Sequence, residues 1–177
     1  MITNLAVEVD NLSGQRLELC YHCHQCTAGC PVVGAMDYGP DQLLRLIALD
    51  ERDTVLPARD IWLCAGCYTC ATHCPNEIDL AAVMDALRQI AVANGYAAGE
   101  RDALLFHRLF LSVVRRLGRS HEATLLGLFK LLARVPLLND LGAGAGLFAR
   151  GKVPLLPEWS GRASAEVKRL FEQSAKK

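Results

Sequence analysis

The chain has 177 residues, 51% of them hydrophobic, a length that fits one compact domain with added helices and argues against two full domains. Its net charge of zero conceals two oppositely charged parts: residues 1–100 carry 5 Lys and Arg against 13 Asp and Glu (−8), and residues 101–177 carry 14 against 6 (+8). The basic residues lie between leucines without interleaved aromatic side chains, which argues against nucleic-acid binding and favours docking on an acidic protein surface.

The first predicted element is a short amphipathic turn at residues 13–20, which should deliver Leu17 and Leu19 to the core. It leads directly into the stretch CYHCHQCTAGCP, residues 20–31. Four cysteines here have the spacing C-x2-C-x2-C-x3-C and are followed at once by proline.

A helix is predicted after this stretch, in PDQLLRLIALDERDTVL, because Pro40 suits the first helical turn. Its apolar face is formed by Leu43, Leu44, Leu46 and Ile47. Asp60 is then expected to cap a helical segment with Ile61 and Trp62, the latter packing in the core. This segment enters a second stretch, CAGCYTCATHCP at residues 64–75, which repeats the first cysteine spacing and its proline.

The most regular predicted helix spans residues 79–94, with Asp79 as its N-cap and Gly95 as its stop. Its apolar positions recur at helical spacing, at Leu80, Val83, Leu87 and Ile90.

Three further helices are predicted in the basic part of the chain. One spans about 100–117 and stops at Gly118, and the next begins at Ser120 and ends before Pro136. A glycine-rich loop at 141–158 precedes a last short helix near 164–173. No alternating pattern typical of a strand is present, so the predicted fold class is all-α.

The two repeated stretches contain all eight cysteines of the chain. Their spacing is typical of thiolate ligands to 4Fe–4S clusters, and in two-cluster ferredoxins the fourth cysteine of each run ligates the other cluster. We therefore expect two 4Fe–4S clusters with crossed ligands. The first set is Cys20, Cys23, Cys26 and Cys74, and the second is Cys64, Cys67, Cys70 and Cys30.

Two other uses of the cysteines remain open. Structural zinc pairs two C-x2-C motifs but requires neither a third cysteine in each run nor the closing proline. Disulfides are disfavoured because the opening sequence, MITNLAVEVDNLSG, lacks the basic and apolar regions of a secretory signal. The expected location is the cytoplasm. The apolar stretches at 103–118 and 123–138 are broken by charges or proline, so no membrane span is expected, although peripheral contact remains possible.

The cysteine runs, the helix between them, the entry IWLC and the following NEIDL together resemble the C subunit of heterodisulfide reductase and its heterodisulfide-reductase-like relatives. GKVPLLPE, at 151–158, resembles a segment that such proteins carry after their helices, and the likeness covers about residues 13–157. The resemblance implies an α-helical ferredoxin domain at 13–95, as in the iron–sulfur subunits of succinate dehydrogenase and fumarate reductase, and a helical docking extension at 96–177.

The resemblance also implies a role as an electron-transfer subunit of an oxidoreductase complex that acts on sulfur groups. Electrons would pass between a flavin-containing A-type protein and a B-type protein whose noncubane clusters carry the thiol or disulfide chemistry. The chain lacks the adjacent Cys-Cys pair that the B-type motifs require, so we expect no catalytic residue in it. Alternatives are the iron–sulfur subunit of another flavin dehydrogenase, of the succinate, fumarate or glycerol-3-phosphate type, and a non-enzymatic cluster or zinc module.

Several smaller features also bear on function. His22 and His24, between ligands of the first run, could tune the first cluster through N–H groups or could simply face solvent. His73 is expected to be a surface or capping residue. GAGAG at 142–146 lacks G-x-G-x-x-G spacing and a preceding strand, and is interpreted as a turn rather than a nucleotide site. Arg115, Arg116 and Arg119 are the candidate docking residues of the basic part.

Overall fold

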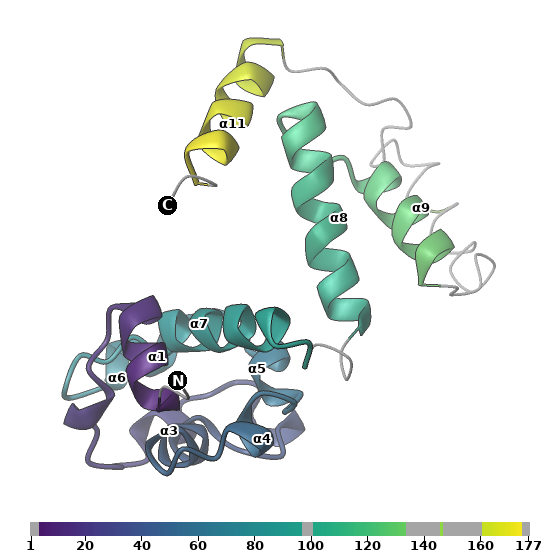
Figure 1. Cartoon of the computed structure of the whole chain (residues 1–177). Coiled ribbons are helices and arrows are strands. Elements are labelled where there is room, and N and C mark those ends of the chain that lie inside the picture. The colour runs from purple at the N-terminus through teal and green to yellow at the C-terminus, as the bar shows by residue number, and fades with distance from the viewer. Residues whose placement is uncertain (1–3, 97–100, 134–145, 147–160, 175–177) are drawn as a thin grey trace. The chain divides into compact units, whose positions relative to one another are not determined.

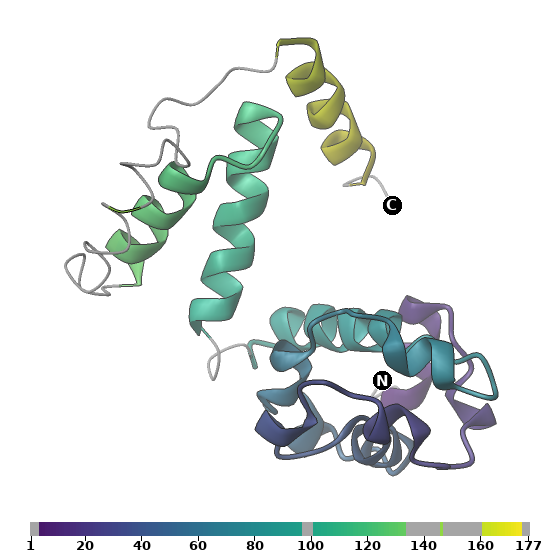
Figure 2. The same cartoon turned by 180° about the vertical axis from the view of Figure 1, so that it is seen from behind.

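The computed structural model of the chain describes residues 4–96, 101–133, 146 and 161–174 (Figures 1 and 2). Every regular element in these ranges is a helix, so the predicted all-α fold class is confirmed. The chain divides into two compact units, residues 1–101 and residues 102–177. None of the described helices is both long and apolar enough to cross a membrane.

Unit 1 contains the cysteine runs and a series of mostly short helices. They are α1 (Leu5–Ser13), η1 (Leu17–Leu19), α2 (Gln25–Ala28), η2 (Val33–Ala35), α3 (Pro40–Ala48), α4 (Arg52–Val55), α5 (Asp60–Leu63), α6 (Thr69–His73) and α7 (Leu80–Ala93). Helix α7 is the longest of them and packs against α1, α5 and α6 (Figure 1).

Helix α7 matches its prediction closely. The carboxylate of Asp79 accepts hydrogen bonds from the backbone N–H groups of Ala81 and Ala82 at 2.9 and 3.2 Å. The helix ends at Ala93, and Gly95 follows with a φ of 77°. The four apolar positions expected at helical spacing, Leu80, Val83, Leu87 and Ile90, are all buried. This helix therefore supplies much of the core that supports the cysteine loops.

The start of unit 1 differs from the prediction. Helix α1 was not expected, yet Leu5 and Val9 are fully buried, and the backbone N–H of Leu5 donates to Asp50 at 2.7 Å. Of the next two leucines, Leu17 is buried but Leu19 is 43% exposed, so the prediction for Leu19 was wrong. The turn is a 3-10 helix with about three residues per turn, and residues two apart therefore point in different directions.

Two details of the middle of unit 1 also differ. The helix that begins at Pro40 ends at Ala48, and Asp50, with a φ of 60°, separates it from α4. Asp60 was predicted as an N-cap, which is wrong: it is the first residue of α5, and Arg59 is the N-cap. The Asp60 carboxylate instead accepts from the backbone N–H of Asp37 at 2.7 Å, a contact distant in sequence.

Unit 2 is the helical C-terminal extension. Its helices are α8 (Arg101–Leu117), which begins at the unit boundary, α9 (Glu122–Leu132) and α11 (Gly161–Ser174). Gly118 ends α8 with a φ of 79°, as predicted. The N-cap of α9 is His121 rather than Ser120, because the His121 ring accepts from the backbone N–H of Thr124 at 3.2 Å.

Within unit 2, the rings of Phe106 and Phe129 meet edge to face with centroids 5.6 Å apart, which joins α8 to α9. Ser164 on α11 donates to the carbonyl oxygen of Arg116 at 3.4 Å. The predicted loop at 141–158 lies outside the described residues except for Gly146.

Candidate functional site

The two cysteine runs form loops with the same local backbone. In the first loop His22 and His24 have φ angles of 56° and 64°, and at the corresponding positions of the second Gly66 and Tyr68 both have 60°. Three of these four residues are not glycine, although the left-handed conformation costs such residues roughly 1–2 kcal/mol. A short helix follows each loop, α2 in the first and α6 in the second. The repeated sequence is therefore also a repeated structure.

Each of two cavities in unit 1 is lined by four cysteines. The first is lined by Cys20, Cys23, Cys26 and Cys74. The second is lined by Cys30, Cys64, Cys67 and Cys70. In each case three cysteines come from one run and the fourth comes from the other. These are the two sets that the sequence predicts as crossed ligand sets.

Contacts between distant segments produce this exchange at the first cavity. Asn76, two residues after Cys74, donates a side-chain hydrogen bond to the carbonyl oxygen of Leu19, next to Cys20. Nearby, the backbone N–H of Asp79 donates to the side chain of Gln15 at 2.9 Å. The end of the second run is thereby fixed beside the beginning of the first.

A corresponding pair of contacts serves the second cavity. Asp37 bonds to Asp60, as described above, and Arg59 donates to the carbonyl oxygen of Ala35 at 3.1 Å. Both contacts join the segment that follows Cys30 to the helix that precedes Cys64. Helices α2 and α6 also pack against each other.

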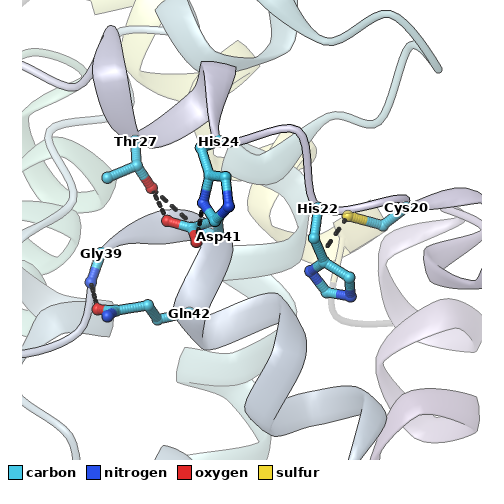
Figure 3. Close-up of polar contacts among 7 residues, drawn as sticks. All are labelled: Cys20, His22, His24, Thr27, Gly39, Asp41 and Gln42. Carbon is cyan, nitrogen blue, oxygen red and sulfur yellow. Dashed lines mark hydrogen bonds and ion pairs between the residues drawn. The ribbon is translucent and has the colours of Figure 1, made fainter.

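A buried carboxylate, Asp41, lies at the first cavity (Figure 3). The Thr27 hydroxyl donates to one Asp41 oxygen, and the same hydroxyl accepts from the Asp41 backbone N–H at 3.0 Å. The other carboxylate oxygen lies 2.6 Å from Nδ1 of His24. Burial raises the pKa of Asp41, but the hydrogen bonds from Thr27 and His24 outweigh it and leave the pKa below its usual range.

Arg88 of α7 holds the entrance of the second cysteine loop. Its guanidinium donates to the carbonyl oxygen of Ile61 at 2.7 Å and to that of Cys64 at 2.9 Å. It also pairs with Asp85 one turn earlier, at 2.8 Å. Its side chain is only 19% exposed. A cation is therefore fixed next to the first cysteine of the second loop.

The chemistry of the thiols fits a cluster that needs four thiolates. All eight cysteines are free. Burial raises the pKa of Cys26, and it raises the pKa of Cys70 to about 11. Exposed Cys67 has a lowered pKa because the hydroxyl and backbone N–H of Thr69 hydrogen-bond to it. Among the described residues, no group of three or more His, Cys, Asp or Glu is arranged to hold a single metal ion.

Comparison with known proteins gives the same chemistry. Residues 16–78 match the family described as a 4Fe-4S dicluster domain. The chain is 36% identical over 107 residues to an iron-sulfur C subunit, the second of that type, of the CoB–CoM heterodisulfide reductase of Methanocaldococcus jannaschii, covering 60% of this chain and 54% of that protein. The chain is a homologue of the heterodisulfide reductase C subunits.

Two other C subunits show similar levels of likeness. The iron-sulfur C subunit of the CoB–CoM heterodisulfide reductase of Methanopyrus kandleri is 32% identical over 82 residues, which are 46% of this chain and 43% of that protein. The C subunit of the ferredoxin/F(420)H(2)-dependent enzyme of Methanosarcina acetivorans is 32% identical over 111 residues, 62% of this chain and 65% of that protein. The chain thus spans about half the length of the curated relatives it matches.

The two histidines of this C-subunit homologue lie differently from each other. Nδ1 of His22 is 3.9 Å from Sγ of Cys20, whereas the His24 side chain is 72% exposed and bonded to Asp41 (Figure 3). Trp62 packs against the core as predicted, and His73 is exposed at the end of α6.

Sequence reasoning missed Thr27, Asp41 and Arg88 as neighbours of the cavities. Asp41 follows Pro40 in the first turn of α3, and that position was the one available signal.

Proposed function

We propose that the chain is an electron-transfer subunit that binds two 4Fe–4S clusters and relays single electrons within a heterodisulfide-reductase-like complex. The observation that carries this proposal is the lining of each cavity by three cysteines from one run and a fourth from the other. In this proposal Cys20, Cys23, Cys26 and Cys74 hold the first cluster, and Cys64, Cys67, Cys70 and Cys30 hold the second. The cluster domain would be residues 13–95, and residues 96–177 would be the docking extension.

A bound 4Fe–4S cluster accepts and returns one electron without forming a bond to a substrate. The residues of the chain hold, separate and shield the two sites. Leu80 lines both cavities and is 2% exposed, so the sites share an apolar wall. Leu44 and Ile78 add buried apolar surface at the first cavity, and Met84 at the second. Close sites with a dry boundary suit transfer of an electron between them.

The proposed partners are a flavin-containing protein of the A type and a noncubane-cluster protein of the B type. The names of the relatives, C subunits of heterodisulfide reductases, support a place in such an assembly. The thiol or disulfide chemistry belongs to the B-type partner, and this chain contributes no catalytic residue. The acidic cluster domain and the basic extension give it two surfaces of opposite charge for docking.

Anaerobic affinity purification of the tagged full chain from its own cells tests the proposal. A flavoprotein and a noncubane-cluster protein should co-purify, and the reduced flavoprotein should reduce the bound clusters of the chain. Co-purification with a quinone-reducing flavin dehydrogenase would place the chain in that class instead. A cluster-loaded chain that purifies alone and accepts no electrons from a flavoprotein would contradict the relay function.

A further inference from the structure

The two cavities differ in the charge that lies beside them. Asp41 is the one acidic residue among the side chains that line either cavity in the described part of the chain, and it lines the first. Its side chain is 9% exposed. Burial is the main cause of the raised pKa of Cys26, and the negative charge of Asp41 contributes to it. The field of Asp41 therefore reaches a cysteine of the first cavity.

The second cavity has a cation instead. The Arg88 guanidinium is hydrogen-bonded to the carbonyl oxygen of Cys64, which lines this cavity. A second bond, to Ile61, fixes the guanidinium in this position. Within the ranges that the structure describes, no acidic side chain lines the second cavity.

Each of these buried charges has a partner of opposite sign on its solvent side. The His24 ring that pairs with Asp41 is 72% exposed, and the Asp85 side chain that pairs with Arg88 is 64% exposed. Water and salt screen exposed charges much more than buried ones. The charge felt at each cavity is therefore mainly that of the buried member, negative at the first and positive at the second.

We propose that Asp41 and Arg88 set unequal reduction potentials at the two sites, so that a single added electron resides at the site of Cys64 rather than at the site of Cys20. A nearby negative charge opposes addition of an electron, and a nearby positive charge favours it. Asp41 lowers the potential of the first cluster, and Arg88 raises that of the second. This inference rests on the proposed function, because it requires a cluster at each cavity.

An EPR-monitored redox titration of the cluster-loaded full chain at pH 8.5, with dithionite as the electron donor, tests the inference. The wild-type chain should show two midpoint potentials. Asp41→Asn removes the charge but keeps an oxygen that accepts from Thr27, and it should raise the lower midpoint while the higher one stays in place. Arg88→Gln should lower the higher midpoint, and Arg88→Lys, which keeps the charge, should lower it less.

Glu51→Gln is the matched control, because Glu51 is an exposed carboxylate of unit 1 that lines neither cavity. It should leave both midpoints unchanged. Asp85→Asn leaves the bonds of Arg88 to the loop intact and should raise the higher midpoint. This variant decides the role of Arg88 if Arg88→Gln loses its clusters.

Three results would overturn the inference: an Asp41→Asn shift confined to the higher midpoint, shifts of one and the same midpoint by the Asp41 and Arg88 variants, or shifts no larger than that of Glu51→Gln. Iron and sulfide analysis of each sample comes first. A wild-type chain without two clusters contradicts the proposed function itself, whereas two clusters with charge-independent potentials contradict only this inference.

Discussion

Cys30 and Cys64 line the same cavity although they belong to different cysteine runs. Cys74, at the end of the second run, lines the other cavity with Cys20. The exchange depends on the contacts that join Asn76 to Leu19 and Asp37 to Asp60. Neither run can therefore complete a four-cysteine set alone, and both sites are expected to depend on the fold of unit 1 as a whole.

Single Cys→Ser variants test the crossed sets. Cys20→Ser and Cys74→Ser should each lose the first cluster and show the same remaining EPR signal. Cys30→Ser should instead match Cys64→Ser, with the second cluster lost. The iron content of each variant should fall by about half, since one of two clusters remains. Matching spectra for Cys20→Ser and Cys30→Ser would show that each run binds its own cluster.

Gly39→Ala should destabilise the first loop. A Cβ at Gly39 would lie 2.9 Å from Cγ2 of Thr27, so the threonine that bonds to Asp41 would have to move. Overpacking of this kind costs about 1–3 kcal/mol. Thermal bleaching of the cluster absorbance should occur at a lower temperature than in wild type. Gly34→Ala, where a Cβ meets no atom within 4 Å, is the control and should bleach like wild type.

Asp79→Ala should weaken the first turn of α7 and with it the support of both cavities. The variant removes the acceptor of two backbone N–H groups, those of Ala81 and Ala82, at a cost of about 1 kcal/mol. Asp79→Ser retains a capping oxygen and should lose much less. Denaturant unfolding followed by circular dichroism measures the difference, and equal stability of the two variants would contradict a capping role.

The basic groove of unit 2 should bind an acidic partner surface. It is lined by Ser112, Arg115, Arg116, Lys168 and Glu172. The double variant Arg115→Glu, Arg116→Glu should recover less partner on co-purification, and the loss should be largest at low salt. Arg108→Glu on the same helix, outside the groove, is the control. Equal recovery with both variants would exclude the groove as the docking surface.

The sequence predicted the parts of the fold that depend on local patterns. The spacing of the cysteines defined the repeated loops, and the cap, periodicity and glycine stop of α7 placed that helix within one residue of its observed ends. The break between α3 and α4 was missed because Asp50 adopts a left-handed conformation that aspartate tolerates but does not announce.

The residues missed around the site are defined by tertiary contacts. Asp41 reaches Thr27 and His24 across a loop, and Arg88 reaches Cys64 from another helix. Asp60 is of a residue type that favours N-caps, but its carboxylate is engaged by Asp37. Such pairings carry no periodic signal, so they are visible only once the chain is folded.

Metal and sulfide analysis of the anaerobically purified chain, with low-temperature EPR after dithionite reduction, tests the central claim most directly. Two 4Fe–4S clusters predict about eight iron and eight sulfide per chain. They also predict an EPR spectrum of two reduced clusters close enough to interact through the shared wall at Leu80. A colourless protein that contains zinc, or a single isolated cluster with half that iron, would contradict the claim.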